Sequence, residues 1–393
     1  MKLPPTLFDP EYDALAQRVE DFSHASLEPR SAEEPDFIAQ ALDLLRLLAH
    51  EGLACYVVPA AYGGVHSAVD IRSLCLIRRG LARYSALADT MFAMQGLGSY
   101  PITLGGSEEL KKKYLPRVAS GEAIATFALT EPEAGSDAAS IQTTARRDGD
   151  HYVLEGRKKF ISNAGVADFY VVFAKTDPAQ GRKGISAIVV EKTCPGFSTQ
   201  KLEVIAPHPI GEVRLEGCRV PVTNRLGQEG EGYSLVMRTL EAFRTTVGAA
   251  ALGLAERALE EALAYAKKRV QFGKTLSEFQ GLRFMLAEMA TELEASRLLV
   301  FTAARRLDEA RRAAPGASLK DDASLVLGSS MAKLYATERA QQVIDRALQI
   351  HGGVGVLRGS VVERLYREVR ALRVYEGTSE IQKEIICHQL LKS

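Results

Sequence analysis

Strand-like runs with no helical pattern between them most constrain the middle of this chain. Between about residues 123 and 228, β-branched and aromatic runs at 169–174, 185–190 and 213–215 are broken by Gly, Pro and Asp. Asp148-Gly149 lies between two further runs and predicts a hairpin turn. Because no helices of roughly 10–15 residues separate these runs, the pattern favours an antiparallel barrel or sandwich over a βαβ sheet.

Helical patterns lie on both sides of this segment. Before it, apolar residues spaced by three and four predict a helix over 37–48, and Ser107 is placed to cap another. After it, long Ala/Leu/Glu/Arg segments predict helices over 231–268, 277–312 and 321–351, which are long enough to form a bundle. We therefore expect an α+β protein with a helical domain over 1–122, a β-barrel domain over 123–230 and a helical bundle over 231–393.

Composition excludes several classes of function. The 393 residues carry 49 Lys+Arg and 49 Asp+Glu, so no net positive field exists to attract nucleic acid or an anionic membrane. No uncharged apolar run approaches the ~18 residues of a membrane span. The five cysteines contain no C-x-x-C pair, and the seven histidines form no H-E-x-x-H motif, which argues against a disulfide framework and a metal site. These features predict a cytoplasmic protein that binds neither nucleic acid nor metal.

The segment 127–137, Phe-Ala-Leu-Thr-Glu-Pro-Glu-Ala-Gly-Ser-Asp, is the first candidate for a binding site. Its small residues allow the backbone to approach a planar or anionic ligand, and the hydroxyls of Thr130 and Ser136 can donate and accept hydrogen bonds. An ordinary turn uses the same residue types, so the segment alone leaves both interpretations open.

Glu376 is the candidate for a catalytic base. It stands between Tyr375 and Gly377, just before a helix expected to begin near Thr378. An aromatic wall would desolvate the carboxylate and raise its proton affinity toward the range useful for removing a weakly acidic C–H proton. The alternative is a solvated loop acid that helps to cap the following helix.

Six separate segments together resemble the acyl-CoA dehydrogenase family, and the likeness runs from about residue 10 to residue 390. In chain order they are residues 127–137, 159–165, 268–274, Gln280, 349–353 and 375–378. The resemblance implies three domains: helical, antiparallel β-barrel and four-helix bundle. It also implies FAD as the cofactor and a homotetramer built as a dimer of dimers.

The resemblance assigns the FAD contacts to three groups of residues. Those expected at the isoalloxazine ring are Phe127, Leu129, Thr130, Ser136, Phe160 and Ser162. Those expected to reach the adenosine and pyrophosphate of FAD in a neighbouring subunit are Arg269, Gln271, Phe272, Gln280, Gln349, Gly352 and Gly353. Thr378 and Glu380 are similar to the last FAD contacts, although the family often has Gln in place of Glu380.

By the same resemblance, Glu376 removes the α-proton of an acyl-CoA thioester while hydride leaves the β-carbon for flavin N5. The product is then the trans-2-enoyl-CoA, as in fatty acid β-oxidation, and an electron-transfer flavoprotein receives the electrons. Arg244, Ser136, Tyr375 and Gly377 are expected to contact the substrate. Some family members carry the base one residue before an arginine like Arg244, where this chain has Phe243.

This chain departs from the family pattern at two places. It has no Trp, so Phe160 stands where many members have a tryptophan, and residues 203–214 lack the usual G-x-R-x-S-x-T segment. By the resemblance, a family member of the decarboxylating glutaryl-CoA type would carry an arginine near the acyl tail, within residues 85–95. This chain has no arginine there, which favours an apolar acyl chain. Two alternatives stay open: an oxidase that passes electrons to oxygen, and a scaffold that binds FAD or acyl-CoA without turnover.

Overall fold

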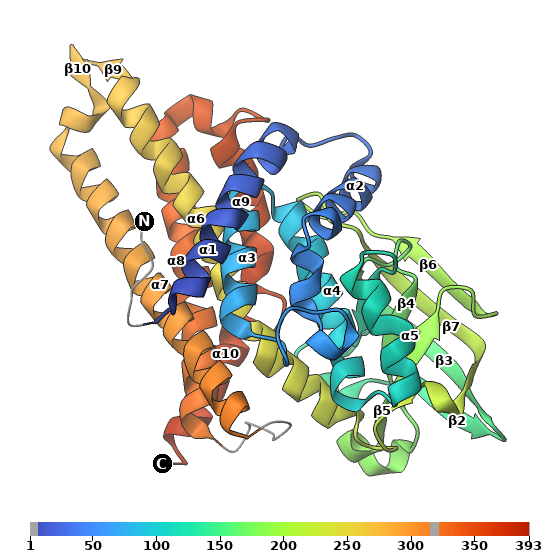
Figure 1. The fold of residues 1–393 in the computed structure, drawn as a ribbon. Helices are drawn as coiled ribbons and strands as arrows, with labels where there is room; N and C mark the ends of the chain where they lie inside the picture. Colours follow the sequence, from blue (N-terminus) through green and yellow to red (C-terminus); the bar gives the residue numbers. More distant parts are fainter. Residues whose placement is uncertain (1–6, 315–321, 393) are drawn as a thin grey trace. The chain divides into compact units, whose positions relative to one another are not determined.

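A computed structural model describes residues 7–314 and 322–392 (Figure 1). The described residues pack into two units. The helical unit comprises residues up to Glu33, Ile71–Asp89 and the chain from Glu241 onward; the mixed unit comprises Glu34–Asp70 and Thr90–Leu240. The domain limits 1–122, 123–230 and 231–393 stay a prediction.

The mixed unit combines a sheet with three helices and with residues 232–240 of α6 (Gly232–Lys268). The helices are α2 (Phe37–His50), α4 (Ala86–Gly105, from residue 90 onward in this unit) and α5 (Glu108–Ala119). The strands are β1 (Ala125–Ala128), β2 (Thr144–Asp148), β3 (His151–Ser162), β4 (Phe169–Lys175), β5 (Ile185–Glu191), β6 (Phe197–Lys201), β7 (Ile210–Pro221) and β8 (Arg225–Leu226). They lie in the order β6-β7-β3-β2-β4-β5-β8, and β1 pairs with β4.

Local sequence signals in this unit are confirmed. Asp148 pairs with His151 across the predicted turn, where Gly149 has φ +63°. Ser107 caps α5 by accepting a hydrogen bond from the backbone N–H of Leu110 at 3.3 Å. Turn and cap residues act on their immediate neighbours, so these features are visible in the sequence alone.

Most strand pairs are antiparallel, as expected, but the sheet is mixed because it also contains two parallel pairings. β1 runs parallel to β4 from Ala125↔Phe169 to Ala128↔Val172, and β2 meets β4 in parallel at Thr144↔Lys175. Parallel partners need a long connection, and the β2–β3 hairpin provides it between β1 and β4. The sequence pattern did not reveal that a hairpin serves as the crossover.

Gln95 of α4 fixes β1, the strand that pairs with β4. Its Oε1 accepts from the backbone N–H of Ala125 at 2.8 Å, and its Nε2 donates to the carbonyl of Ala123 at 2.9 Å. One turn further on, a Cβ at Gly98 would lie 2.5 Å from the backbone N of Thr126. Only glycine therefore allows α4 to pack this close to the strand.

The helical unit contains the long helices expected from the C-terminal sequence. Its helices are α1 (Pro10–Phe22), α3 (Ile71–Tyr84), α6 (Gly232–Lys268, from residue 241 onward in this unit), α7 (Gln280–Ala313), α8 (Ala323–His351), α9 (Val361–Val369) and α10 (Ser379–Leu390). The predicted helix over 321–351 begins at Ala323, and residue 321 lies outside the described residues.

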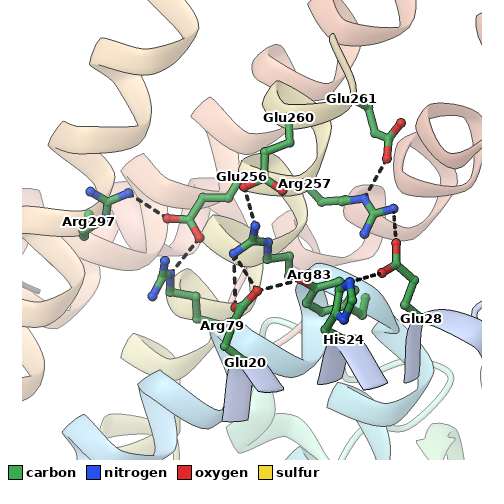
Figure 2. A network of polar contacts seen from close by, with 11 residues as sticks. Glu20, His24, Glu28, Arg79, Arg83, Glu256, Arg257, Glu260, Glu261 and Arg297 are labelled. Carbon is green, nitrogen blue, oxygen red and sulfur yellow. Dashed lines mark hydrogen bonds and ion pairs between the residues drawn. The ribbon is translucent and has the colours of Figure 1, made fainter. Parts of the chain in front are cut away.

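A network of ion pairs joins α1, α3, α6 and α7 in this unit (Figure 2). At its buried end, Glu256 of α6 accepts from Arg79 Nε at 2.7 Å and from Arg297 Nη2 at 2.8 Å. Burial opposes ionisation of Glu256, but the two guanidinium groups outweigh it and lower the pKa of this carboxyl. Arg83 extends the network to Glu20 and Glu260.

No helix of the described chain is both long and apolar enough to cross a membrane.

We predict that Glu256→Gln destabilises the protein by about 3 kcal/mol, because it removes the buried carboxylate that pairs with Arg79 and Arg297; Arg297 keeps its pair with Glu294. The matched control is Glu309→Gln, which breaks an exposed pair with Arg305 and should cost about 0.5 kcal/mol or less. Urea unfolding followed by circular dichroism measures both variants. Equal losses for the two would contradict the assigned role of the buried network.

Candidate functional site

The candidate site residues fall into one group in each unit. Phe127, Leu129, Thr130, Ser136, Phe160 and Ser162 belong to the mixed unit. The helical unit holds Arg244, Arg269, Gln271, Phe272, Gln280, Gln349, Gly352, Gly353, Tyr375, Glu376, Gly377, Thr378 and Glu380.

In the mixed unit, a buried ion pair joins the two motif segments. Lys158, on β3, is fully buried; its Nζ donates to Glu131 Oε1 at 2.8 Å and to the carbonyl of Leu129 at 3.0 Å. The backbone N–H of Lys159 also donates to the carbonyl of Thr130 at 2.8 Å. Burial lowers the pKa of Lys158 to about 8, although Glu131 opposes the shift. The sequence showed both charges but gave no sign that they pair across these segments.

Phe160 presents its ring outward from a distorted strand. The β3–β7 pairing is irregular between Lys158 and Ile161, and Phe160 there has φ +57°. Positive φ is costly for a bulky residue and persists where the surrounding structure enforces it. The side chain is 56% exposed, so its ring offers a planar apolar surface to a ligand.

The other candidates in this unit range from buried to exposed. Phe127 and Leu129 are almost buried, and the Phe127 ring packs 4.7 Å from that of Phe173. Thr130 is half-buried, whereas Ser136 is exposed and follows Gly135, around which a Cβ would meet nothing within 4 Å. The Thr130–Ser136 stretch therefore has room for a bound group beside it.

The Ser162 hydroxyl is held by a residue that the sequence did not single out. Its Oγ lies 2.7 Å from His208 Nε2. Burial lowers the pKa of His208 to about 4, so the imidazole is neutral at pH 7. His208 lies within the stretch 203–214 that departs from the family pattern.

In the helical unit, one set of candidates lies on an exposed hairpin between α6 and α7 (Figure 1). Strands β9 (Val270–Gln271) and β10 (Lys274–Thr275) form it, and Phe272 at its tip has φ +52° and is 93% exposed. Gln349, Gly352 and Gly353, where α8 ends, are exposed as well. An aromatic ring held almost entirely in solvent gains stability only when another molecule covers it.

Glu376 occupies a tight turn before α10. It has φ +53° and is followed by Gly377 with φ +90°. The hydroxyl of Thr378 caps α10 by accepting from the backbone N–H of Ile381 at 3.3 Å, so the cap does not require the Glu376 side chain. Glu380 follows in the first turn and is exposed.

Two side chains hold this turn through its carbonyl groups. Lys333 of α8, which is fully buried, donates from Nζ to the carbonyl of Gly377 at 2.8 Å. Gln382 Nε2 donates to the same carbonyl at 3.0 Å and to that of Glu376 at 3.3 Å. The strained backbone of Glu376 is thus held from α8 and α10.

The Glu376 carboxylate is desolvated and lies in a strongly charged environment. The residue is half-buried, and its Oε2 is a buried atom that has no hydrogen-bond partner among the described residues. Burial raises the pKa of Glu376. The positive charges of Arg78, Lys333 and Arg244 oppose this shift, whereas the negative charge of Asp89 adds to it. A carboxylate of this kind has a spare acceptor oxygen and an increased affinity for a proton.

Arg78 and Asp89 form a buried ion pair in this environment. Arg78 Nε donates to Asp89 Oδ1 at 2.8 Å and its Nη2 to Oδ2 at 2.9 Å. The remaining terminal nitrogen, Nη1, donates to Thr246 Oγ1 at 2.8 Å, and Arg78 also hydrogen-bonds to Tyr375. Arg78 lies outside residues 85–95, where no arginine occurs, and no sequence signal pointed to it.

Arg244 also lies in this buried region. It donates from Nη1 to Ser330 Oγ at 3.2 Å, while its Nε is buried with no partner among the described residues. Burial lowers its pKa. A buried guanidinium with an unused donor is suited to bind a polar or anionic group.

Comparison with known families matches almost the whole chain. The models described as "Acyl-CoA dehydrogenase, N-terminal domain", "middle domain" and "C-terminal domain" match residues 9–122, 126–218 and 230–391, respectively.

Three curated proteins are similar to this chain over nearly their full length. A 3-(aryl)acrylate reductase of Clostridium sporogenes is 38% identical, covering 98% of this chain and 100% of its own. The probable acyl-CoA dehydrogenase FadE25 of Mycobacterium tuberculosis is 38% identical, over 97% and 96%. The CarC subunit of the caffeyl-CoA reductase-Etf complex of Acetobacterium woodii is 37% identical, over 98% and 99%.

Solved structures agree in fold. The butyryl-CoA dehydrogenase of Megasphaera elsdenii has a TM-score of 0.88 at 33% identity and covers 100% of both chains. An acyl-CoA dehydrogenase of Bacillus anthracis complexed with FAD has a TM-score of 0.89 at 33% identity, covering 99% of this chain and 68% of its own.

Proposed function

Because this chain belongs to the acyl-CoA dehydrogenase family, we propose that it catalyses α,β-dehydrogenation of an acyl-CoA thioester, with Glu376 as the base for the α-proton. Family members are oxidoreductases that use FAD, and the three-domain fold is that of the family. The observation that carries the proposal is the buried Oε2 of Glu376, which has no hydrogen-bond partner within residues 7–314 and 322–392 and lies in a turn with positive φ.

The residues present suit FAD. The exposed Phe160 ring, the open space beside Gly135 and the hydroxyls of Thr130 and Ser162 suit a planar, polar-edged ring system. We assign the flavin contacts to Phe127, Leu129, Thr130, Ser136, Phe160 and Ser162, with Thr378 and Glu380 as further contacts. When bound, FAD supplies the acceptor for the hydride that leaves the β-carbon.

Glu376 can take the proton because its surroundings favour the change from charged to neutral. A thioester α-proton is a very weak acid, so it needs a base of raised proton affinity and donors where negative charge develops on the carbonyl oxygen. Burial supplies the first condition, and the backbone N–H of Glu376 is our candidate for a donor. Lys333 and Gln382 hold the turn that carries both groups.

Arg78 limits how far this pKa rises. Without a nearby cation, burial would favour a protonated carboxyl, which cannot act as a base. Because Asp89 and Thr246 accept from all three of its guanidinium nitrogens, Arg78 is held in place and acts on Glu376 through its charge. Its charge is also balanced by Asp89, so it does not call for an anionic acyl tail, and the proposal keeps an apolar acyl chain.

Arg244, with its unused Nε, is the proposed contact for the CoA portion of the substrate, together with Ser136, Tyr375 and Gly377.

As the acceptor of the electrons, we propose an electron-transfer flavoprotein, since one relative is named as a subunit of an Etf complex. Two relatives are named as reductases, which supports the reverse reaction, reduction of an enoyl-CoA, as a further proposal for this chain. An oxidase and a non-catalytic scaffold remain alternatives. A fatty-acid pathway and a cytoplasmic location stay predictions.

We further propose a homotetramer in which a neighbouring subunit provides part of each FAD site. The support is the exposed hairpin with Phe272 at its tip and the exposed groups at the end of α8, all outside the buried core. Arg269, Gln271, Phe272, Gln280, Gln349, Gly352 and Gly353 are the proposed contacts to the neighbour's FAD.

Glu376→Gln tests the proposed base. The variant keeps the shape of the side chain but removes the basic oxygen, so we expect reduction of bound FAD by an acyl-CoA to slow by about 10³-fold. Anaerobic bleaching of the flavin absorbance, tested with acyl-CoAs of several lengths, measures the rate. Glu384→Gln, at an exposed position on α10, is the matched control. An FAD-loaded wild type that no acyl-CoA bleaches, or a Glu376→Gln variant as fast as wild type, would sink the proposal.

Two substitutions should move the acid limb of the pH–rate profile in opposite directions. Arg78→Met removes a charge that lowers the pKa of Glu376, so the rate should begin to rise only at higher pH than in wild type. Asp89→Asn removes a charge that raises this pKa, so the limb should move to lower pH. Single-turnover flavin reduction across pH measures both. Shifts in the same direction would contradict the assigned electrostatics.

Phe272→Ser tests the subunit contribution. Loss of an apolar contact worth about 1.5–3 kcal/mol should weaken FAD retention by at least about tenfold and reduce the fraction of tetramer. Light scattering gives the mass, and fluorescence of released FAD after dilution gives the retention. Val65→Ser, at an exposed apolar position outside the proposed contacts, is the control. A wild type that is monomeric while holding FAD would contradict the subunit contribution.

A further inference from the structure

His208 forms a direct contact with Ser162, one of the proposed flavin contacts. The distance from His208 Nε2 to Ser162 Oγ is 2.7 Å, which is a well-formed hydrogen bond. The histidine belongs to the stretch that precedes β7, whereas Ser162 is the last residue of β3. Two segments separated by more than 40 residues therefore meet at this hydroxyl.

The backbone around both residues fixes their positions. Ser162 pairs with Ile210 in the β3–β7 register, and the N–H of Asn163 donates to the carbonyl of Pro209 at 2.6 Å. The Ser162 carbonyl accepts from Thr126 Oγ1, which ties it to β1. His208 stands between Pro207 and Pro209, and each proline restricts φ to a narrow range. The imidazole is thus held at the serine by rigid backbone on both sides.

The neutral state of His208 determines what the contact can do. A neutral imidazole carries one N–H, so Nε2 either donates to the hydroxyl or accepts from it. If it donates, Ser162 uses a lone pair for the histidine and keeps its own proton for another acceptor. If it accepts, the proton of Ser162 is committed to the histidine. The tautomer of His208 therefore decides whether Ser162 is a donor to a bound ligand.

We propose that His208 is a positioning residue that donates from Nε2 to Ser162 Oγ and so directs the hydroxyl proton of Ser162 toward the edge of the bound flavin. This inference rests on the proposed function, because it requires FAD at the Phe160–Ser162 segment. The β3–β7 pairing is irregular around the outward-facing Phe160 and ends at the Ser162↔Ile210 pair. Ile210 lies two residues after His208. One stretch of chain thus supports both the flavin-facing ring and the hydroxyl.

The test compares His208→Leu with His208→Gln. Leucine removes the donor, whereas the glutamine amide nitrogen can replace Nε2 and donate to the same oxygen. We expect His208→Leu to weaken FAD binding about fivefold, the loss of one neutral hydrogen bond, and to shift the visible absorbance and midpoint potential of the bound flavin. His208→Gln should restore all three properties toward wild type.

Ser162→Ala shows whether the effect passes through the serine. In that background, His208→Leu should produce no further shift in spectrum or potential, because the hydroxyl that it positions is gone. An equal shift with and without the hydroxyl would overturn the proposal, as would a His208→Leu protein that matches wild type in all three properties.

A measurement on wild type covers the case in which His208→Leu fails to fold. With ¹⁵N-labelled histidine, the imidazole of His208 should show a protonated Nε2 and an unprotonated Nδ1 at pH 7. The opposite tautomer would overturn the inference and leave the proposed function intact. A wild-type protein that does not bind FAD would instead overturn the proposed function.

Discussion

The proposed chemistry depends on one carboxylate oxygen of Glu376, which is buried and has no hydrogen-bond partner in the part of the chain that the structure describes. A buried acid without a hydrogen-bond partner is costly, and here it lies on a backbone with φ +53° that adds further cost. Lys333 and Gln382 hold the turn, and Arg78 with Asp89 sets the local charge. The burial and the positive φ lower the stability of the turn, but they keep the Glu376 carboxylate out of water, which raises its affinity for a proton.

The mixed unit solves a different problem, which is to offer a rigid surface to a ligand. The fully buried Lys158 pairs with Glu131 and so joins β3 to the 127–137 segment. The irregular β3–β7 pairing beyond Lys158 leaves Phe160 exposed. In each unit, buried residues that are not proposed ligand contacts hold the candidate residues in position. Those supporting residues carry the buried charges, whereas several of the proposed contacts are exposed.

Features set by neighbouring residues were predictable from the sequence. The long C-terminal helices, the turn at Asp148-Gly149 and the helix that starts after Thr378 follow from periodicity and capping. Pairings between distant residues were not. Arg78 meets Thr246 across 168 positions, and β1 pairs with β4 around a hairpin. The sequence shows which charged and polar residues are present but not which of them pair in the fold. The supporting roles of Arg78, Lys333, Lys158 and His208 were therefore visible only in the structure.

The protonation state of Glu376 is the most direct test of the central claim. Infrared difference spectra of the wild type and a Glu376→Gln variant, recorded across pH, isolate the carbonyl stretch of the protonated carboxyl group. Because burial raises the pKa of Glu376, this band should persist above pH 4.5, the ordinary pKa of a glutamate. A band that has already vanished below that pH would show a solvated carboxylate and contradict a base held in a dry site.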